Sequence, residues 1–220
     1  MSAVEAVVFD LDGVLIDSER VWDEVREQLA LERGGRWHEQ AQTDMMGMSS
    51  TEWSRYLHEA IGLAEPPEEL NAEVVRRMQA RYAEHLPLID GAVEASKRLA
   101  EVFRLALASS SNRPLIDVVL SSAGLDALFE VTVSSEEVER GKPAPDVFLE
   151  AARRLALEPA RCVAIEDSAN GIRSAHAAEM RVVAIPNRHY PPPAEALALA
   201  DEVLDSLADL TPAAVTGETV

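Results

Sequence analysis

Short runs of apolar residues alternate with amphipathic stretches along most of this chain. Apolar runs bounded by turn residues are typical of strands buried on both faces of a parallel sheet. Six runs predict strands, at residues 4–9, 103–108, 129–133, 162–165, 181–185 and 202–204. Helical spacing predicts helices at residues 90–100 and 146–156, and two more that end near residues 123 and 178. This alternation predicts an α/β fold, a doubly wound parallel sheet with right-handed crossovers.

Residues 18–85 break the alternation, because they show helical spacing but no run that predicts a strand. Helices are predicted at residues 19–33, 51–61 and 68–85. A segment of this length exceeds an ordinary connection between a strand and the next helix. We therefore expect two domains, an α/β core formed by residues 1–16 and 87–220 and a helical domain formed by residues 17–86.

Polar residues directly follow three of the predicted strands. They are Asp10 and Asp12, Ser109 and Ser110, and Glu166 and Asp167. The carboxyl ends of parallel strands meet at one edge of a sheet, which is the usual binding edge of this kind of fold. The loop that carries Lys142 follows a fourth strand and can reach the same edge. The sequence therefore predicts one functional site built from these four segments.

The two carboxylates of Asp10 and Asp12 are separated by a single leucine and repel each other. A bound cation, a shared proton, or both would compensate for this repulsion. Asp10 and Asp167 offer hard oxygen ligands of the kind that Mg²⁺ prefers. A structural alternative is a simple turn after the strand, because Asp and Gly are common turn residues.

The other segments also have structural alternatives. Residues 109–112 are suited to begin the next helix, and residues 166–168 are suited to a helix N-terminus where acidic side chains are favourable. Considered without the other segments, Lys142 would be interpreted as an ordinary solvated lysine in a loop. It is, however, one of only two lysines among 20 basic residues, which suggests a need for a compact ammonium group.

The net charge of −19 argues against partners such as nucleic acid or an anionic membrane surface. No apolar run has the length of a membrane span, and the N-terminus lacks a signal-peptide pattern, so we expect a cytoplasmic protein. The single cysteine, Cys162, lies in an apolar run and is predicted to be a buried core residue. We expect a monomer, because no apolar seam is evident.

Residues 10–15, Asp-Leu-Asp-Gly-Val-Leu, resemble the first motif of the haloacid dehalogenase superfamily, in its β-phosphoglucomutase and sugar-phosphatase branch. The remaining motifs of that family have counterparts here in the same order over nearly the whole chain. The resemblance implies a Rossmann-like core, and it implies that the inserted helical segment is the cap domain of the family. It also implies Mg²⁺ as the cofactor and a small phosphorylated metabolite as the substrate.

The resemblance assigns a role to each candidate residue. Asp10 corresponds to the nucleophile that forms an aspartyl phosphate, and Asp12 to the general acid and base, whose carbonyl also binds the metal. Ser109, Ser110 and Lys142 correspond to the phosphate-binding residues. Asp167 corresponds to a metal ligand, with Glu166 in the inner or outer coordination sphere. These assignments agree with the chemistry of phosphoryl transfer to a carboxylate.

Two features favour a phosphatase over a mutase. The mutase pattern has a histidine at the position of Trp22. It also has a cap arginine that aligns with Ser50, the last residue of Gly47-Met48-Ser49-Ser50. Residues 18–22 instead resemble a stretch of sugar and hexitol phosphatases, which makes Glu19 and Trp22 candidates for substrate contact. Packing in the hinge or core is an equally good interpretation of Trp22.

The sequence thus predicts a Mg²⁺-dependent hydrolase of small phosphorylated sugars or polyols. A hexose-phosphate mutase is the alternative, and a non-catalytic phosphate-binding regulatory protein is a less favoured one.

Overall fold

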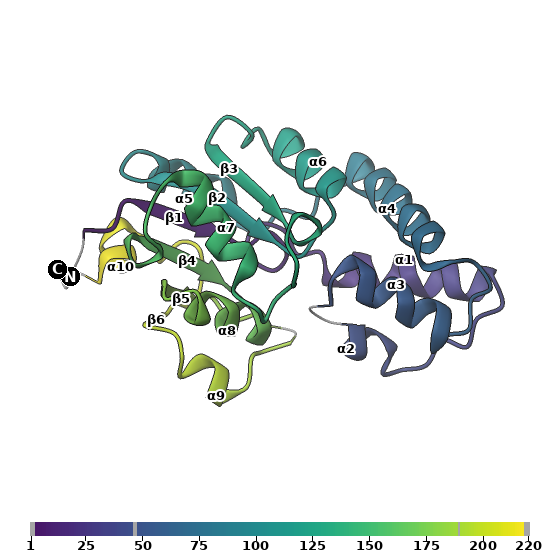
Figure 1. The fold of residues 1–220 in the computed structure, drawn as a ribbon. Helices are drawn as coiled ribbons and strands as arrows, with labels where there is room; N and C mark the ends of the chain where they lie inside the picture. The colour runs from purple at the N-terminus through teal and green to yellow at the C-terminus, as the bar shows by residue number, and fades with distance from the viewer. Residues whose placement is uncertain (1–2, 46–47, 189, 218–220) are drawn as a thin grey trace.

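The computed structural model describes residues 3–45, 48–188 and 190–217. Six parallel strands form one sheet in the order β3-β2-β1-β4-β5-β6 (Figure 1). The strands are β1 Ala6–Phe9, β2 Arg104–Ser109, β3 Phe129–Ser134, β4 Cys162–Glu166, β5 Arg181–Ala184 and β6 Glu202–Val203. The predicted α/β fold with a parallel sheet is confirmed, with each strand within about two residues of its predicted place.

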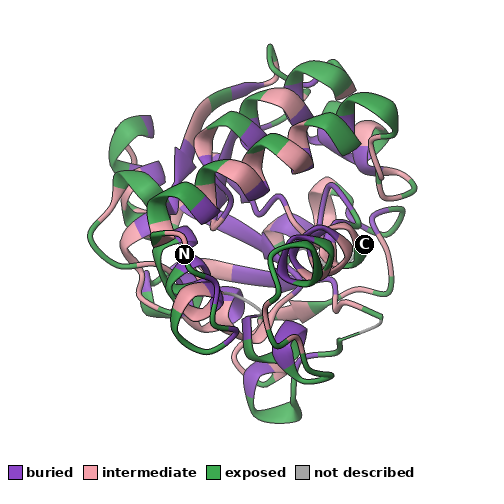
Figure 2. Cartoon of the chain, turned by 90° about the vertical axis from the view of Figure 1, so that its right-hand side faces the viewer, coloured by how far each residue is buried: buried purple, intermediate pink, exposed green. Residues whose placement is uncertain are grey.

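Helices cover both faces of the sheet, because alternate side chains of each buried strand point to opposite sides. On one face, Val7 and Phe9 of β1 lie in one apolar cluster with α5 (Ala92–Ala100), α6 (Arg113–Ala123) and α10 (Pro212–Thr216). On the other face, Ala6 and Val8 lie in a second cluster with α7 (Asp146–Leu155) and α8 (Ala169–Ala177). Figure 2 shows the buried strands between outer helices with exposed surfaces.

Several short elements were not predicted, because they contain too few residues to show a period. They are α9 (Ala194–Leu197), α10, and the 3-10 turns η1 (Ser135–Glu137) and η2 (Pro159–Arg161). Cys162 is buried in β4, as predicted, and burial raises the pKa of its thiol to about 11. Among the described residues, no helix has the length and apolar character needed to cross a membrane.

In the described part of the chain, four helices lie between β1 and α5 and form a separate group beside the sheet (Figure 1). They are α1 (Glu19–Glu32), α2 (Ala41–Met45), α3 (Ser50–Glu59) and α4 (Pro67–Glu84). Helix α2 was not predicted, and Gly47 of the compared mutase motif lies outside the described residues. We call residues 17–86 the cap segment; its boundaries as a domain stay a prediction.

The chain enters and leaves the cap segment through two neighbouring stretches. The Asp17 N–H donates to the Pro87 carbonyl at 2.8 Å, and the Ile89 N–H donates to the Leu15 carbonyl at 3.0 Å. These two hydrogen bonds fix both ends of the cap segment at the same point, next to the carboxyl end of β1.

A second connection joins the cap segment to the core. The Ser50 hydroxyl of α3 donates to Glu136 Oε1 at 3.3 Å, and Asn112, just before α6, donates to the same oxygen at 2.6 Å. The Asn112 amide also lies 3.1 Å from Asn71 Oδ1 of α4. The cap segment is therefore held over the carboxyl edge of the sheet from two sides.

Candidate active site

The strand register brings the predicted site residues to one edge of the sheet. Phe9 of β1 is paired with Leu107 of β2 and with Ile165 of β4. Asp10 follows Phe9 directly, and its N–H donates to the Ile165 carbonyl at 3.0 Å. Asp10 thus lies between the end of β2, at Ser109, and the end of β4.

Three carboxylates gather at this edge. Asp10, Glu166 and Asp167 each offer one oxygen atom such that all three atoms lie within 4.8 Å of one another. All three side chains are buried, and Glu166 is fully so. Lys142 is also buried, with Nζ 2.7 Å from Glu166 Oε1 and 3.0 Å from Asp10 Oδ1. One lysine charge therefore faces three buried carboxylates.

Glu166 is the most firmly held member of this group. Its Oε1 accepts a hydrogen bond from Lys142, and its Oε2 accepts from the Asp167 N–H at 3.0 Å and from the Ser168 N–H and hydroxyl at 3.2 Å. A Cβ at Gly171 would lie 1.8 Å from the Glu166 carboxylate, so only glycine leaves room for it. Gly13, at φ +79°, likewise leaves room for the Asp167 carboxylate.

Burial and mutual repulsion make it costly for these carboxylates to be ionised together. Burial raises the pKa of Asp10 to about 8, with Lys142 opposing this rise and Glu166 and Asp12 adding to it. Burial, together with Glu166 and Asp10, holds the pKa of Asp167 well above its usual value. Burial opposes the charge of Lys142, but Asp10 and Glu166 outweigh it and raise the Lys142 pKa.

A divalent cation fits this arrangement. Asp10 Oδ1 is buried, and its described contact is the ion pair with Lys142, whose single positive charge is shared with Glu166. Oxygen donors with uncompensated negative charge are the ligands that Mg²⁺ favours. The cluster is therefore compatible with metal binding, as the sequence predicted.

Asp12 is held by donors from both the core and the cap segment. Its Oδ1 accepts hydrogen bonds from the Ser18 hydroxyl and from Trp22 Nε1, the latter at 3.2 Å. Its Oδ2 accepts from the Ser111 hydroxyl at 2.6 Å. Ser18 precedes α1 but makes no side-chain cap, because its hydroxyl is directed to Asp12.

The serines at the end of β2 differ in burial and in their contacts. Ser109 is fully buried, and its Oγ accepts a hydrogen bond from the Ser111 N–H at 3.0 Å. Ser110 and Ser111 line the cavity at the carboxyl edge. The sequence singled out Ser109 and Ser110 but missed Ser111, although its position one residue further along the same polar run was a usable signal.

The cavity at this edge has a volume of about 220 Å³ and is lined by both parts of the chain. Asp10, Asp12 and Lys142 line it from the core. Glu19 and Trp22, predicted to contact substrate, line it from the cap segment. Burial raises the pKa of Glu19 to about 7, with Asp12 adding to the rise and Arg26 opposing it.

Trp22 combines the two roles that the sequence left open. Its indole N–H donates to Asp12, while its ring lies 5.9 Å from the Trp53 ring, centroid to centroid. Arg26, one helical turn further along α1, lines the same cavity. Arg26 is not among the residues predicted from the sequence, although its spacing of four residues from Trp22 puts both on one helix face.

Residues 4–179 match the family of haloacid dehalogenase-like hydrolases. Hexitol phosphatase B of Escherichia coli K12 is 32% identical over 228 residues, which cover 94% of this chain and 94% of that protein. The bifunctional riboflavin kinase/FMN phosphatase of Arabidopsis thaliana is 34% identical over 206 residues. That match covers 93% of this chain and 54% of the relative, so the chain spans about half of the relative's length.

Solved structures agree with the sequence comparison. CbbY of Rhodobacter sphaeroides, crystallised as a mutant with xylulose 1,5-bisphosphate, superimposes with a TM-score of 0.82 at 28% identity. The similarity covers 96% of this chain and 99% of that chain.

Proposed function

This chain belongs to the haloacid dehalogenase-like hydrolase family, and from this premise we propose that it hydrolyses small phosphorylated sugars or polyols with Mg²⁺. The family and the relatives named as phosphatases support a phosphoric monoester hydrolase. The observation that carries the proposal is the buried group of Asp10, Glu166, Asp167 and Lys142 at a cavity that also contains Asp12.

The substrate class is supported by what similar proteins act on. One relative is named for hexitol phosphates, and one structural neighbour binds a sugar bisphosphate. The cavity of about 220 Å³ suits a small metabolite rather than a polymer. The net charge of −19 argues against a nucleic acid as the substrate.

We propose that Asp10 and Asp167 hold Mg²⁺, together with the backbone carbonyl of Asp12 and with Glu166 beside them. When bound, the ion supplies positive charge that offsets the carboxylates and the transferred phosphoryl group. Lys142 contributes a second positive charge at the phosphate. Because burial raises the pKa of Asp10 to about 8, positive charge nearby is needed to keep this carboxylate ionised at neutral pH.

In the proposed reaction, Asp10 attacks the phosphorus atom. The new Asp10–phosphorus bond forms as the bond to the sugar oxygen breaks, which gives an aspartyl phosphate and a free alcohol. The N–H of Ser110, close to the N-terminus of α6, and the Ser109 hydroxyl are proposed to hold phosphate oxygens. The Ser109 oxygen accepts a hydrogen bond from the Ser111 N–H, which leaves its O–H free to donate to a phosphate oxygen.

Asp12 is proposed as the general acid and base. It would give a proton to the leaving sugar oxygen, and later take a proton from the water that attacks the phosphorus atom as the Asp10–phosphorus bond breaks, which releases inorganic phosphate and restores the Asp10 carboxylate. The three donors around Asp12 support this role, because they fix the position of a carboxylate that lines the same cavity as Asp10. Among the described residues, Asp12 Oδ2 accepts a hydrogen bond from Ser111 alone, so it keeps a second lone pair for the proton that is exchanged with substrate.

The cap segment, residues 17–86, is proposed to close over the substrate as a separate domain. Closure would exclude bulk water and select the leaving group. Glu19 and Trp22 are its proposed substrate contacts, and Glu19 Oε2 is already positioned by a 3.1 Å bond from the Gln42 amide. We propose that the protein acts as a monomer.

The proposal is tested by phosphate release from a panel of sugar and polyol phosphates, with Mg²⁺ and with EDTA. Release that requires Mg²⁺ and is lost in Asp10→Asn supports the phosphatase. Conversion of a hexose phosphate without phosphate release, dependent on a bisphosphate activator, would indicate the mutase. Unchanged ligand binding by Asp10→Asn, with no turnover by the unmodified protein, would indicate a binding protein.

A further inference from the structure

Arg26 is a buried arginine in the wall of the active-site cavity. It lies on α1 and is 5% exposed. Its guanidinium carbon lies 4.5 Å from the centroid of the Trp22 ring and 4.8 Å from that of the Trp53 ring. Two indoles from two helices thus position a cation at the side of the cavity provided by the cap segment.

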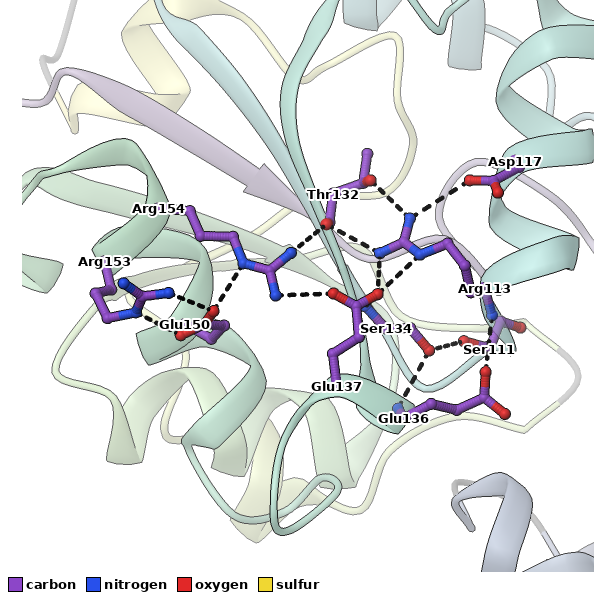
Figure 3. Close-up of polar contacts among 10 residues, drawn as sticks. All are labelled: Ser111, Arg113, Asp117, Thr132, Ser134, Glu136, Glu137, Glu150, Arg153 and Arg154. Carbon is purple, nitrogen blue, oxygen red and sulfur yellow. Dashed lines mark hydrogen bonds and ion pairs between the residues drawn. The ribbon is translucent and has the colours of Figure 1, made fainter.

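Arg26 has no ion-pair partner and donates no hydrogen bond within the described part of the chain, and its buried Nε is unpaired. Other arginines behave differently. Arg113 and Arg154 both form ion pairs with the Glu137 carboxylate. Arg113 also donates a hydrogen bond to Thr132 Oγ1 at 2.7 Å, and Figure 3 shows this network. A buried charge without a partner is unfavourable unless something else satisfies it.

The charged and titratable groups around Arg26 do not satisfy it. Its pKa is affected electrostatically by four groups, which are Glu19, Asp12, Asp23 and the Tyr82 phenol. Among the described residues, no carboxylate lies within 4.0 Å of Arg26 as an ion-pair partner. Burial lowers the pKa of Arg26 to about 10, so it remains protonated at neutral pH. The positive charge is therefore present in the cavity and available to a ligand.

We propose that Arg26 binds a second anionic group of the substrate, at the end remote from the phosphate that reacts with Asp10. This inference rests on the proposed phosphatase function and narrows its substrate class to phosphorylated sugar derivatives with a further carboxylate or phosphate. The planar guanidinium matches the paired oxygens of either group, and the two indoles restrict where it can lie. A neutral hydroxyl would leave the Arg26 guanidinium without an ion-pair partner.

The test compares pairs of esters that differ at the remote end. Glycerol 3-phosphate and 3-phosphoglycerate differ by a carboxylate, and fructose 6-phosphate and fructose 1,6-bisphosphate differ by a phosphate. We expect kcat/KM to be about tenfold or more higher for the anionic member of at least one pair. The pair that shows the effect identifies which anion Arg26 binds.

The variant Arg26→Met keeps an apolar stem between the tryptophans and removes the charge. We expect the ratio of kcat/KM between the anionic and neutral members to fall about tenfold, mainly through KM, and Arg26→Lys to retain part of it. Arg20→Met is the matched control, because Arg20 lies on the same helix with an 88% exposed side chain. Its ratio should equal that of the unmodified protein.

Binding gives a readout that does not need turnover. Calorimetry with Asp10→Asn should show tighter binding of the anionic member, and adding Arg26→Met should remove the difference. Equal affinity for both members of both pairs, or a preference that survives Arg26→Met, would overturn the inference. Absence of turnover on every ester in Mg²⁺ would instead count against the phosphatase, while the calorimetric comparison would still decide the role of Arg26.

Discussion

Trp22 Nε1 donates a hydrogen bond to Asp12 Oδ1 at 3.2 Å. This bond joins the first helix of the cap segment to the proposed acid and base in the core. It means that the position of α1 affects the orientation of Asp12 directly. The proposed proton transfer and the placement of the cap segment are therefore linked through one side chain.

Trp22→Phe should keep the ring that packs against Trp53 and Arg26, but it removes the donor to Asp12. We expect kcat to fall about threefold to tenfold, which corresponds to about 1 kcal/mol for one hydrogen bond, with little change in Tm. Steady-state kinetics on the best substrate would measure this. Trp37→Phe is the control, since Trp37 is a partly buried residue of the cap segment that does not line the cavity, and its kcat should stay near that of the unmodified protein.

Asp167→Asn removes one buried carboxylate from the proposed metal site. In EDTA at pH 7 to 8 we expect a higher Tm than that of the unmodified protein, because the Asp167 pKa is raised by burial, Glu166 and Asp10. The rise in Tm that Mg²⁺ gives the unmodified protein should disappear in this variant. Differential scanning calorimetry with and without Mg²⁺ measures both effects.

Asp117→Asn is the control for this experiment, because the side chain of Asp117 is 65% exposed on α6. It should show the same Mg²⁺ response as the unmodified protein. A full Mg²⁺ response in Asp167→Asn would contradict the assignment of Asp167 as a ligand.

Glu19→Gln should change how stability depends on pH. Burial raises the pKa of Glu19 in the folded protein from 4.5 to about 7, so ionisation of this group costs folding free energy progressively from about pH 4.5 to pH 7. Glutamine avoids this cost. We expect the variant to match the unmodified protein below pH 4.5 and to exceed it by up to about 3 kcal/mol above pH 7.

Urea unfolding at several pH values measures the Glu19 effect as a difference between the variant and the unmodified protein. Glu59→Gln, on the exposed surface of α3, is the control and should show no such pH-dependent gain. A stability difference that is the same at pH 5 and pH 8 would show that the Glu19 carboxyl does not carry it.

Gly171→Ala should disrupt the support of Glu166. The added methyl group would lie 1.8 Å from the Glu166 carboxylate, so Glu166 must move away from Lys142 and from the Ser168 N–H. We expect a loss of about 2–3 kcal/mol of unfolding free energy and a large loss of activity.

Gly124→Ala is the comparison for Gly171. Gly124 ends α6 at φ +65° with no atom within 4 Å of the added Cβ, so only backbone strain of about 1 kcal/mol is expected. If both variants lose the same stability, the close approach at Gly171 is not the cause.

The sequence predicted the part of the site that depends on sheet geometry. Asp10, Ser109 and Glu166 follow or end parallel strands, and such strands bring their carboxyl ends together in any fold of this kind. Lys142 was predicted because the loop after β3 reaches the same edge. None of these positions depends on how the cap segment is placed.

The part of the site that depends on the cap segment was harder to predict. Arg26 has Glu24 and Glu27 as charged neighbours on α1, and its spacing of four residues from Trp22 is the only local sign that it faces the cavity rather than solvent. Its burial results from Trp53, which comes from α3 and meets Trp22 only in the folded protein. The hydrogen bond from Ser111 to Asp12 likewise joins residues that are distant in sequence.

The strand order of the sheet also has a consequence for synthesis of the protein. Strand β1 directly precedes Asp10 and lies between β2 and β4, so the first strand to be synthesised pairs on one side with a strand that is synthesised much later. A growing chain leaves the ribosome with Asp10 and Asp12 already present, but Lys142 and Glu166 emerge much later. The carboxylate cluster can therefore assemble only when most of the polypeptide has been translated, and unfinished chains lack it.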